Sequence, residues 1–193
     1  MTHRVEEDEV REKKDIRLFF ALWPDEALRQ RLQEAAIAIP IEAGGRRVPG
    51  ANLHLTLHFI GNVYFEQMDC LQAAARSVNA PGFDLTIDVQ GFFKKPRVAW
   101  LGCDNPPAAL GELHRQLGKR LQACHFHSSN FQPEARPYHP HVTVARKSGS
   151  IAADACFAPI DWPVTGFALV EVQAIKNGVQ YRAVETYPLN LST

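Results

Sequence analysis

Hydrophobic and polar positions follow two different periods along the chain, and the change between these periods predicts a fold that mixes strands and helices. Residues 16–23 (IRLFFALW) form a continuous apolar run, which is typical of a buried strand. Pro24 follows at the position that suits the first turn of a helix. The next apolar residues repeat with helical spacing up to Pro40 and predict an amphipathic helix: Leu28, Leu32, Ala35, Ala36 and Ile39.

Strand and helix patterns alternate along the rest of the chain. We predict strands at 46–48, about 52–60, 83–89, 97–102, about 138–145, 167–175 and 181–189, and helices at 64–78, from 106 to 121 and, weakly, near 151–156. Gly61-Asn62 is predicted to end the second strand as a turn. Hairpins are predicted to join 83–89 to 97–102 and, across Asn177-Gly178, the last two strands.

The segment His54-Leu55-Thr56-Leu57 has a near copy, His141-Val142-Thr143-Val144, 141 − 54 = 87 residues later. Because successive side chains of a strand point to opposite faces, the histidine and the threonine of each copy share one face. Each copy lies within the same predicted order of strand, helix, motif strand, helix and hairpin. A lone copy would indicate only a half-buried strand. The duplication instead predicts two imidazoles and two hydroxyls around one site, which suits proton transfer at a phosphoryl group.

Composition narrows the class of protein only slightly. The 193 residues fit one domain, which we place at 16–193 after a charged, flexible tail at 1–15. Lys+Arg and Asp+Glu are both 21, so no overall basic field indicates binding of long nucleic acid, and a short RNA end or a nucleotide remains allowed. The four cysteines have no Cys-x-x-Cys spacing, and no apolar run reaches about 18 residues. We therefore expect a cytoplasmic protein with reduced thiols and no membrane segment.

Five segments carry a resemblance to a known family: IRLFFALWP at the start, NLHLTLHFIG around His54, RVAWLG at 97–102, RPYHPHVTVAR around His141 and YRAVETYPL near the end. They resemble the 2H phosphoesterases and, within them, the RNA 2′,3′-cyclic phosphodiesterases, also called 2′-5′ RNA ligase-like (LigT/ThpR) proteins. The resemblance implies an α+β fold of two pseudo-symmetric lobes, with antiparallel sheets lining a central cleft and helices on the outside. It also implies catalysis without a metal or another cofactor.

The resemblance implies roles for six residues. His54 is expected to be the general acid toward the 3′ oxygen of a cyclic phosphate and His141 the general base toward water, although the residue types alone leave these two roles interchangeable. Thr56 and Thr143 are expected to donate hydrogen bonds to phosphate oxygens, and Arg146 to add a fixed positive charge. Phe59 matches an aromatic residue that stacks on the base in this family, but strict alternation places it on the face opposite His54 unless the strand end is bulged.

Three alternatives to this reading remain. A zinc site would draw on His125, His127, His139 and His141, with His58 continuing the His54 face, but no carboxylate or paired cysteine accompanies these histidines. A second enzyme reading takes a small cyclic nucleotide or an ADP-ribose cyclic phosphate as substrate. The third is a non-catalytic module that binds RNA ends, which the intact histidines and threonines disfavour. We expect a monomer whose partners are RNA ends or cyclic nucleotides.

Overall fold

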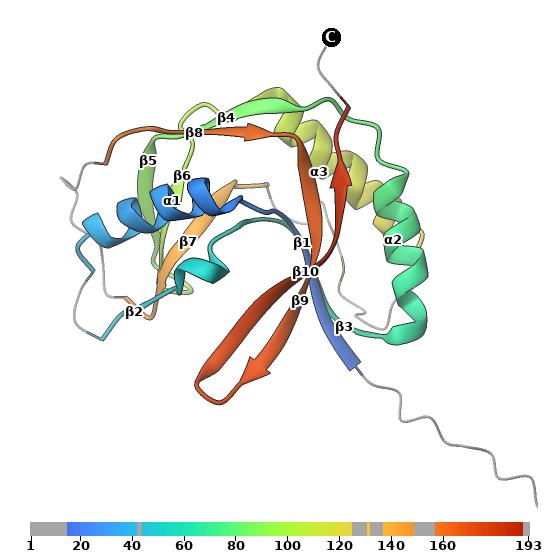
Figure 1. Ribbon diagram of the computed structural model, residues 1–193, viewed down its shortest axis with the longest axis horizontal. Helices are drawn as coiled ribbons and strands as arrows, with labels where there is room; N and C mark the ends of the chain where they lie inside the picture. The colour runs from blue at the N-terminus through green and yellow to red at the C-terminus, as the bar shows by residue number, and fades with distance from the viewer. Residues whose placement is uncertain (1–14, 42–43, 125–130, 132–136, 149–156, 191–193) are drawn as a thin grey trace, which may run out of the picture.

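The computed structural model describes residues 15–41, 44–124, 131, 137–148 and 157–190. The strands are β1 (Asp15–Leu22), β2 (Arg46–Arg47), β3 (Leu55–Tyr64), β4 (Phe83–Ile87), β5 (Val89–Phe93), β6 (Val98–Gly102), β7 (His141–Arg146), β8 (Ile160–Val164), β9 (Gly166–Ile175) and β10 (Gly178–Pro188). The α-helices are α1 (Glu26–Ala38), α2 (Met68–Arg76) and α3 (Ala108–Leu121), and two short 3₁₀ turns are η1 (Gly50–Asn52) and η2 (Phe65–Gln67). Figure 1 shows their arrangement, with α2 and α3 side by side.

Eight strands form one sheet in the order β10-β9-β1-β3-β7-β6-β5, with β2 beside β7. Strands β4 and β8 form a separate two-stranded sheet. Every named strand pairing is antiparallel, so the expected α+β fold with antiparallel sheets is confirmed. The large sheet has two halves, because β3 and β7 pair only through Leu55 and Val142 in the described chain. These halves carry one copy of the motif each.

The two faces of the large sheet differ in what covers them. Leu18, Phe20 and Leu22 of β1 point into the main core, which also contains the apolar faces of the three helices. Because side chains alternate along a strand, Phe19 and Ala21 point to the other face. There they form a small cluster with Ala168 and Val170 of β9. This second face carries the motif side chains, since Ala21 pairs directly with Thr56.

Two strand predictions are wrong in their details. Residues 83–89 do not form one strand paired with 97–102: β4 ends at Ile87 and pairs with β8, while β5 pairs with β6. Strand β8 was not predicted, because its short sequence IDWPV contains a proline. Gly61 does not end β3, which continues to Tyr64. The φ of Gly61 is 89°, a left-handed conformation that glycine adopts without strain and that lets the strand bend and go on.

The prediction of reduced thiols is wrong for two of the four cysteines. Cys70 of α2 and Cys124, just after α3, form a disulfide, whereas Cys103 is free. They are 54 positions apart in the sequence, and only the packing of α2 against α3 brings them together. Spacing along the chain could not reveal this pair. Structural disulfides are rare in cytosolic proteins, so the expected compartment stays a prediction.

Some expectations fall on parts of the chain that the structure does not describe. These are the charged tail except Asp15, most of the polar loop at 125–137 and the short helical stretch near 151–156. Among the helices that are described, none is both long and apolar enough to cross a membrane.

Candidate active site

The two His-x-Thr segments meet at the Leu55–Val142 pair that joins the halves of the sheet. Both residues of this pair are fully buried in the main core. Their neighbours along each strand therefore point to the opposite face. The antiparallel register places His54 level with Thr143, and Thr56 level with His141. The four motif side chains thus come together on one face, related by a pseudo-two-fold axis through the pair.

Both imidazoles are oriented in the same way, by the backbone carbonyl two residues earlier. The Nδ1 of His54 donates to the Asn52 carbonyl oxygen at 2.7 Å, and the Nδ1 of His141 donates to that of His139 at 2.7 Å. Since a carbonyl only accepts, each neutral ring carries its proton on Nδ1. Each Nε2 is left to act on a ligand. The Nε2 of His54 lies 3.0 Å from the Thr56 hydroxyl oxygen.

The carbonyl that orients His54 is itself held in place by the buried side chain of Asn52. Its Nδ2 donates to the Val179 carbonyl oxygen at 2.8 Å, and its Oδ1 accepts from the Tyr181 amide at 3.0 Å. Turn η1 is thereby fastened to β10. The hydroxyl of Tyr138 donates to the Thr56 carbonyl oxygen at 3.1 Å and so ties the approach to the second motif to the first. Both motifs are therefore preorganised by hydrogen bonds to the surrounding backbone.

Aromatic rings flank each catalytic candidate. The ring of His54 lies 4.6 Å from Phe19, 5.2 Å from Tyr181 and 6.0 Å from Trp23, measured between centroids. His141 lies 5.1 Å from Phe93 and 6.5 Å from Trp100. None of these five aromatic residues was predicted from the sequence to lie at the site. The alternation within residues 16–23 carried a signal for Phe19 and Trp23, because the core-facing positions are Leu18, Phe20 and Leu22.

Strand β3 contains a bulge that corrects the expected positions of Phe59 and His58. Phe20 pairs with His58 and Ala21 with Thr56, so Leu57 is an extra residue. Phe59 then pairs with Phe19 on the site face, with 52% of its surface exposed, so the bulged alternative holds and strict alternation does not. His58 instead enters the core, where its Nε2 lies 2.8 Å from the His114 carbonyl oxygen. His58 therefore does not continue the His54 face.

Strand β7 contains the matching bulge, and it brings Arg146 into the site. Ala99 pairs with Ala145 and Trp100 with Thr143, so Val144 is the extra residue. In each motif the bulged residue follows the histidine by three positions: 57 − 54 = 3 and 144 − 141 = 3. Strict alternation would turn Arg146 away from His141, but the bulge turns it back. The positive charge of Arg146 lowers the pKa of both His54 and His141, so Arg146 acts on both.

The electrostatics of the site favour an anion. The pKa of His54 is lowered to about 4, mainly by burial and further by the charges of Arg146 and His141, while the hydrogen bond to Asn52 acts in the opposite direction. Burial is also the main cause of the lowered pKa of His141, with smaller contributions from His139 and Arg146. Both imidazoles are therefore neutral near pH 7 in the free protein. A bound phosphate would offset the charge of Arg146 and favour the protonated form of a histidine.

The lowered pKa of His54 predicts how stability depends on pH. Because the folded pKa of about 4 lies below the unfolded value near 6.5, the unfolded chain takes up the proton first as the pH falls. This group's contribution is intact above pH 6.5 and decreases between about 6.5 and 4, by up to about 1.4 kcal/mol per pH unit. Denaturant unfolding at several pH values should show that the free energy of unfolding falls more steeply with decreasing pH in the parent than in His54→Gln. Equal slopes would contradict the lowered pKa.

The zinc alternative gains no support from the part of the chain that is described. Within it, no three histidine, cysteine, aspartate or glutamate side chains are grouped as metal ligands. His125 and His127 lie outside the described residues. His58 lies on the core face, so it cannot share a ligand with His54.

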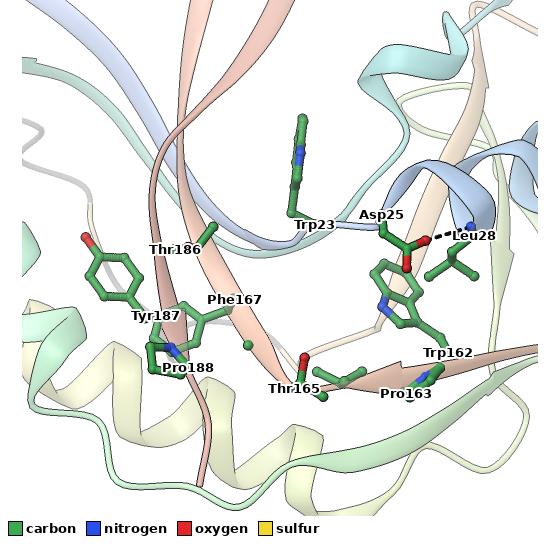
Figure 2. A pocket seen from close by; sticks show the side chains of 12 residues that line it. Trp23, Asp25, Leu28, Trp162, Pro163, Thr165, Phe167, Thr186, Tyr187 and Pro188 are labelled. Carbon is green, nitrogen blue, oxygen red and sulfur yellow. Dashed lines mark hydrogen bonds between the residues drawn. The ribbon is translucent and has the colours of Figure 1, made fainter. Parts of the chain in front are cut away.

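A cavity of about 380 Å³ lies beside Trp23, whose ring is 6.0 Å from that of His54. Figure 2 shows it between Trp23, Asp25 and Trp162 and the ends of β9 and β10. Asp25 is engaged there as the N-cap of α1, since its Oδ1 accepts from the Leu28 amide at 2.8 Å. The twelve lining residues include none of the six predicted site residues and no lysine, arginine or histidine.

Comparison with known proteins places the chain in a family. A family model described as the 2′-5′ RNA ligase superfamily matches residues 24–178. The RNA 2′,3′-cyclic phosphodiesterase of Escherichia coli is 37% identical over 179 residues, which cover 90% of this chain and 96% of that protein. The protein of the same name from Thermus thermophilus is 30% identical over 184 residues and 90% of each chain.

Solved structures agree with the sequence comparison. Escherichia coli LigT in its apo form superposes with a TM-score of 0.77 at 30% identity, over 92% of this chain and 99% of LigT. LigT in complex with 3′-AMP gives a TM-score of 0.76 at 32% identity, over 91% and 99%. The chain therefore belongs to the 2′-5′ RNA ligase superfamily.

Proposed function

We propose that this protein hydrolyses 2′,3′-cyclic phosphate ends of RNA to 2′-phosphate ends without a metal ion. In the reverse direction, it would join RNA ends through a 2′-5′ linkage. The observation that carries the proposal is the pairing of Leu55 with Val142, which gathers both His-x-Thr segments on one face. Relatives named RNA 2′,3′-cyclic phosphodiesterase, and a LigT structure with 3′-AMP, support a nucleotide phosphate as the ligand.

The proposed reaction uses the Nε2 atoms of His54 and His141 in opposite roles. The Nε2 of His141 takes a proton from water as the water oxygen bonds to phosphorus. The bond between phosphorus and the 3′ oxygen breaks, and the Nε2 of a protonated His54 gives its proton to that oxygen. The product keeps the phosphate on the 2′ oxygen. The two histidines then return to their starting states by exchanging protons with water.

The pKa of His54 has a consequence for this division of labour. A general acid must start protonated, whereas the free protein holds His54 neutral at pH 7 because its pKa is about 4. We propose that the anionic substrate supplies the missing stabilisation, since a negative charge beside an imidazole raises its pKa. His54 would then become an acid only when a phosphate is bound.

In this proposal, the other site residues bind the phosphate and the terminal nucleobase. The hydroxyls of Thr56 and Thr143 and the guanidinium of Arg146 stabilise the charge that develops on the non-bridging oxygens. Phe59, brought to the site face by the bulge and half exposed, offers a ring on which the terminal base stacks. The guanidinium of Arg17 lies 5.0 Å above this ring and helps to hold it.

Two alternatives are weaker. A small cyclic nucleotide or an ADP-ribose cyclic phosphate would need the same phosphate chemistry, so the site alone does not separate it from an RNA end. A non-catalytic module that binds RNA ends would not need two imidazoles, each oriented through Nδ1 by a backbone carbonyl. The monomeric state and the cytoplasmic location remain parts of the proposal.

Turnover with and without a chelator tests the metal-free mechanism. Because two imidazoles perform both proton transfers, we expect a 2′,3′-cyclic mononucleotide to be converted to the 2′-phosphate at the same rate in excess EDTA. The products should be identified by ³¹P NMR, which distinguishes 2′- from 3′-phosphate. Loss of activity with the chelator would support the metal reading, and binding of the nucleotide without turnover would support the non-catalytic module.

A further inference from the structure

Three segments near the site contain basic residues and no acidic ones. They are 44–54, 89–102 and 137–148, and together they contain Arg46, Arg47, Lys94, Lys95, Arg97, Arg146 and Lys147. The whole chain, by contrast, has equal numbers of basic and acidic residues, 21 of each. The overall neutrality of the protein therefore hides a local excess of positive charge.

The sheet brings these segments to one end of the site. Arg46 of β2 pairs with Arg146 of β7, and Arg146 pairs with Val98 of β6 on its other side. Val98 in turn pairs with Phe93, and the turn between them contains Lys94 and Lys95. The basic residues thus lie across four neighbouring strands, on both sides of Arg146.

Two of the arginines have structural tasks. The guanidinium of Arg47 donates to the carbonyl oxygens of Ala36, Ile37 and Ile39 at the end of α1. Arg97 donates through Nε to the Ser148 carbonyl oxygen at 3.0 Å and through a terminal nitrogen to that of Lys147 at 3.3 Å. Arg97 thereby fastens the turn between β5 and β6 to the end of β7 and holds Lys94 and Lys95 near Lys147.

Within the described residues, the other cations of this group have no ion-pair partner. Arg46, Lys94, Lys95 and Lys147 are exposed, and none of the ion pairs in the described residues involves them. We call these four residues the basic rim. Arg46 also lies directly opposite Arg146 in the antiparallel register, so both side chains leave the sheet on the site face. Like charges directly opposite each other are unfavourable, and an anion bound between them would remove this cost.

An aromatic surface lies between the rim and His141. Phe93, next to Lys94 in sequence, lies 5.3 Å from Trp100 and 5.3 Å from His139. The ring of Trp100 packs on β5 at Gly91, where an added Cβ would lie only 2.1 Å from the ring. The glycine therefore makes room for this ring. Partly exposed aromatic rings beside unpaired cations are the combination with which proteins bind single-stranded nucleic acid.

We propose that the basic rim binds the phosphates of the RNA chain behind the reacting end, so that the preferred substrate is an oligonucleotide rather than a mononucleotide. This inference rests on the proposed function and assigns the path of the chain beyond the reacting phosphate. The cavity beside Trp23 offers no such path, since its lining contains Asp25 and no basic residue. A bound RNA would leave the site over Phe93 toward Lys94 and Lys95.

The test compares a 2′,3′-cyclic mononucleotide with an octanucleotide that ends in a 2′,3′-cyclic phosphate. For the parent we expect a higher kcat/KM with the octanucleotide, and this advantage should shrink as salt is added. In the double variant Lys94→Ala/Lys95→Ala, kcat/KM should fall about tenfold with the octanucleotide and less than about twofold with the mononucleotide. Its dependence of log affinity on log salt should be shallower by about 1.4, which is about 0.7 for each phosphate that the variant no longer neutralises.

The matched control removes two exposed cations elsewhere. Lys119→Ala/Arg120→Ala has the same loss of charge on α3, which packs on the core side of the sheet, and should behave as the parent. Equal losses with both substrates in the rim variant, or no preference of the parent for the longer substrate, would overturn the inference. Fluorescence anisotropy with an octanucleotide that ends in a 2′-phosphate measures RNA binding without catalysis. It therefore distinguishes failure of the rim inference from failure of the proposed function. If neither substrate turns over, weaker binding by the rim variant alone still supports the rim, and equal binding overturns it.

Discussion

Alanine in place of His54 or of His141 is expected to lower the turnover of a 2′,3′-cyclic phosphate by about 10²–10⁴-fold, which is the usual contribution of one general acid or base. Neither ring contributes to the main core, so both variants should fold. The two losses should not multiply in the double variant, because both residues act on one transition state. Steady-state rates on a mononucleotide, with circular dichroism to verify folding, measure both effects.

The two single variants should respond differently to the leaving group. A phosphodiester with a leaving group of low pKa needs little help from an acid, so it should rescue the variant without the acid far more than the variant without the base. His54→Ala is expected to be the rescued one. Equal rescue would contradict the division of labour. Near-parental activity of either variant would contradict the mechanism itself.

The pH profile of the parent adds an independent check. The rate should fall on the acid side as the base becomes protonated and on the alkaline side as the acid loses its proton. NMR titration of the His54 ring should give a pKa of about 4 in the free protein and a higher value with a 2′-phosphate ligand bound. An unchanged pKa in the complex would show that the substrate does not create the acid.

The elements around both motifs could be predicted from the sequence because each has a clear hydrophobic period. The buried run at 16–23 became β1, and the leucine pattern after Pro106-Pro107 became α3. Strands β9 and β10 form the predicted hairpin, with its turn at Lys176-Asn177, one residue before the predicted pair. The meeting of the two motifs followed from their duplication. The pairing of β4 with β8 did not, because long-range partners leave no mark in the local pattern. Nor did the disulfide between Cys70 and Cys124, which depends on how α2 packs against α3.

The two bulges explain what strict alternation could not predict. One extra residue, Leu57 or Val144, reverses the face of the side chains that follow it, in β3 as far as a second register shift between Phe59 and Gly61. Phe59 and Arg146, each five positions after its histidine, reach the site for this reason. A bulge depends on pairing with a neighbouring strand, so a single strand's sequence does not reveal it. Because the bulges have equal spacing from the two histidines, both halves of the sheet bring the fifth residue after the histidine to the site face by the same change of register.

Replacement of Arg146 by alanine is expected to lower kcat/KM by about 10²–10³-fold, the range found when one preorganised donor to a developing negative charge is removed. Arg146 is exposed at the end of β7, so its loss should leave the fold intact. Arg146→Lys should recover only part of the rate, because lysine keeps the charge but not the planar pair of donors. Steady-state kinetics on a mononucleotide measure this effect without a contribution from a longer RNA chain.

A second consequence separates direct action on the phosphate from a role in the fold. The charge of Arg146 lowers the pKa of both His54 and His141, so Arg146→Ala should raise both pKa values and shift the acid limb of the pH profile upward. Arg46→Ala is the matched control, since it removes the same charge from the paired position on the neighbouring strand. It should change the rate with a mononucleotide much less. Unchanged kinetics and unchanged histidine titration in Arg146→Ala would make this residue an ordinary solvated arginine at the end of a strand.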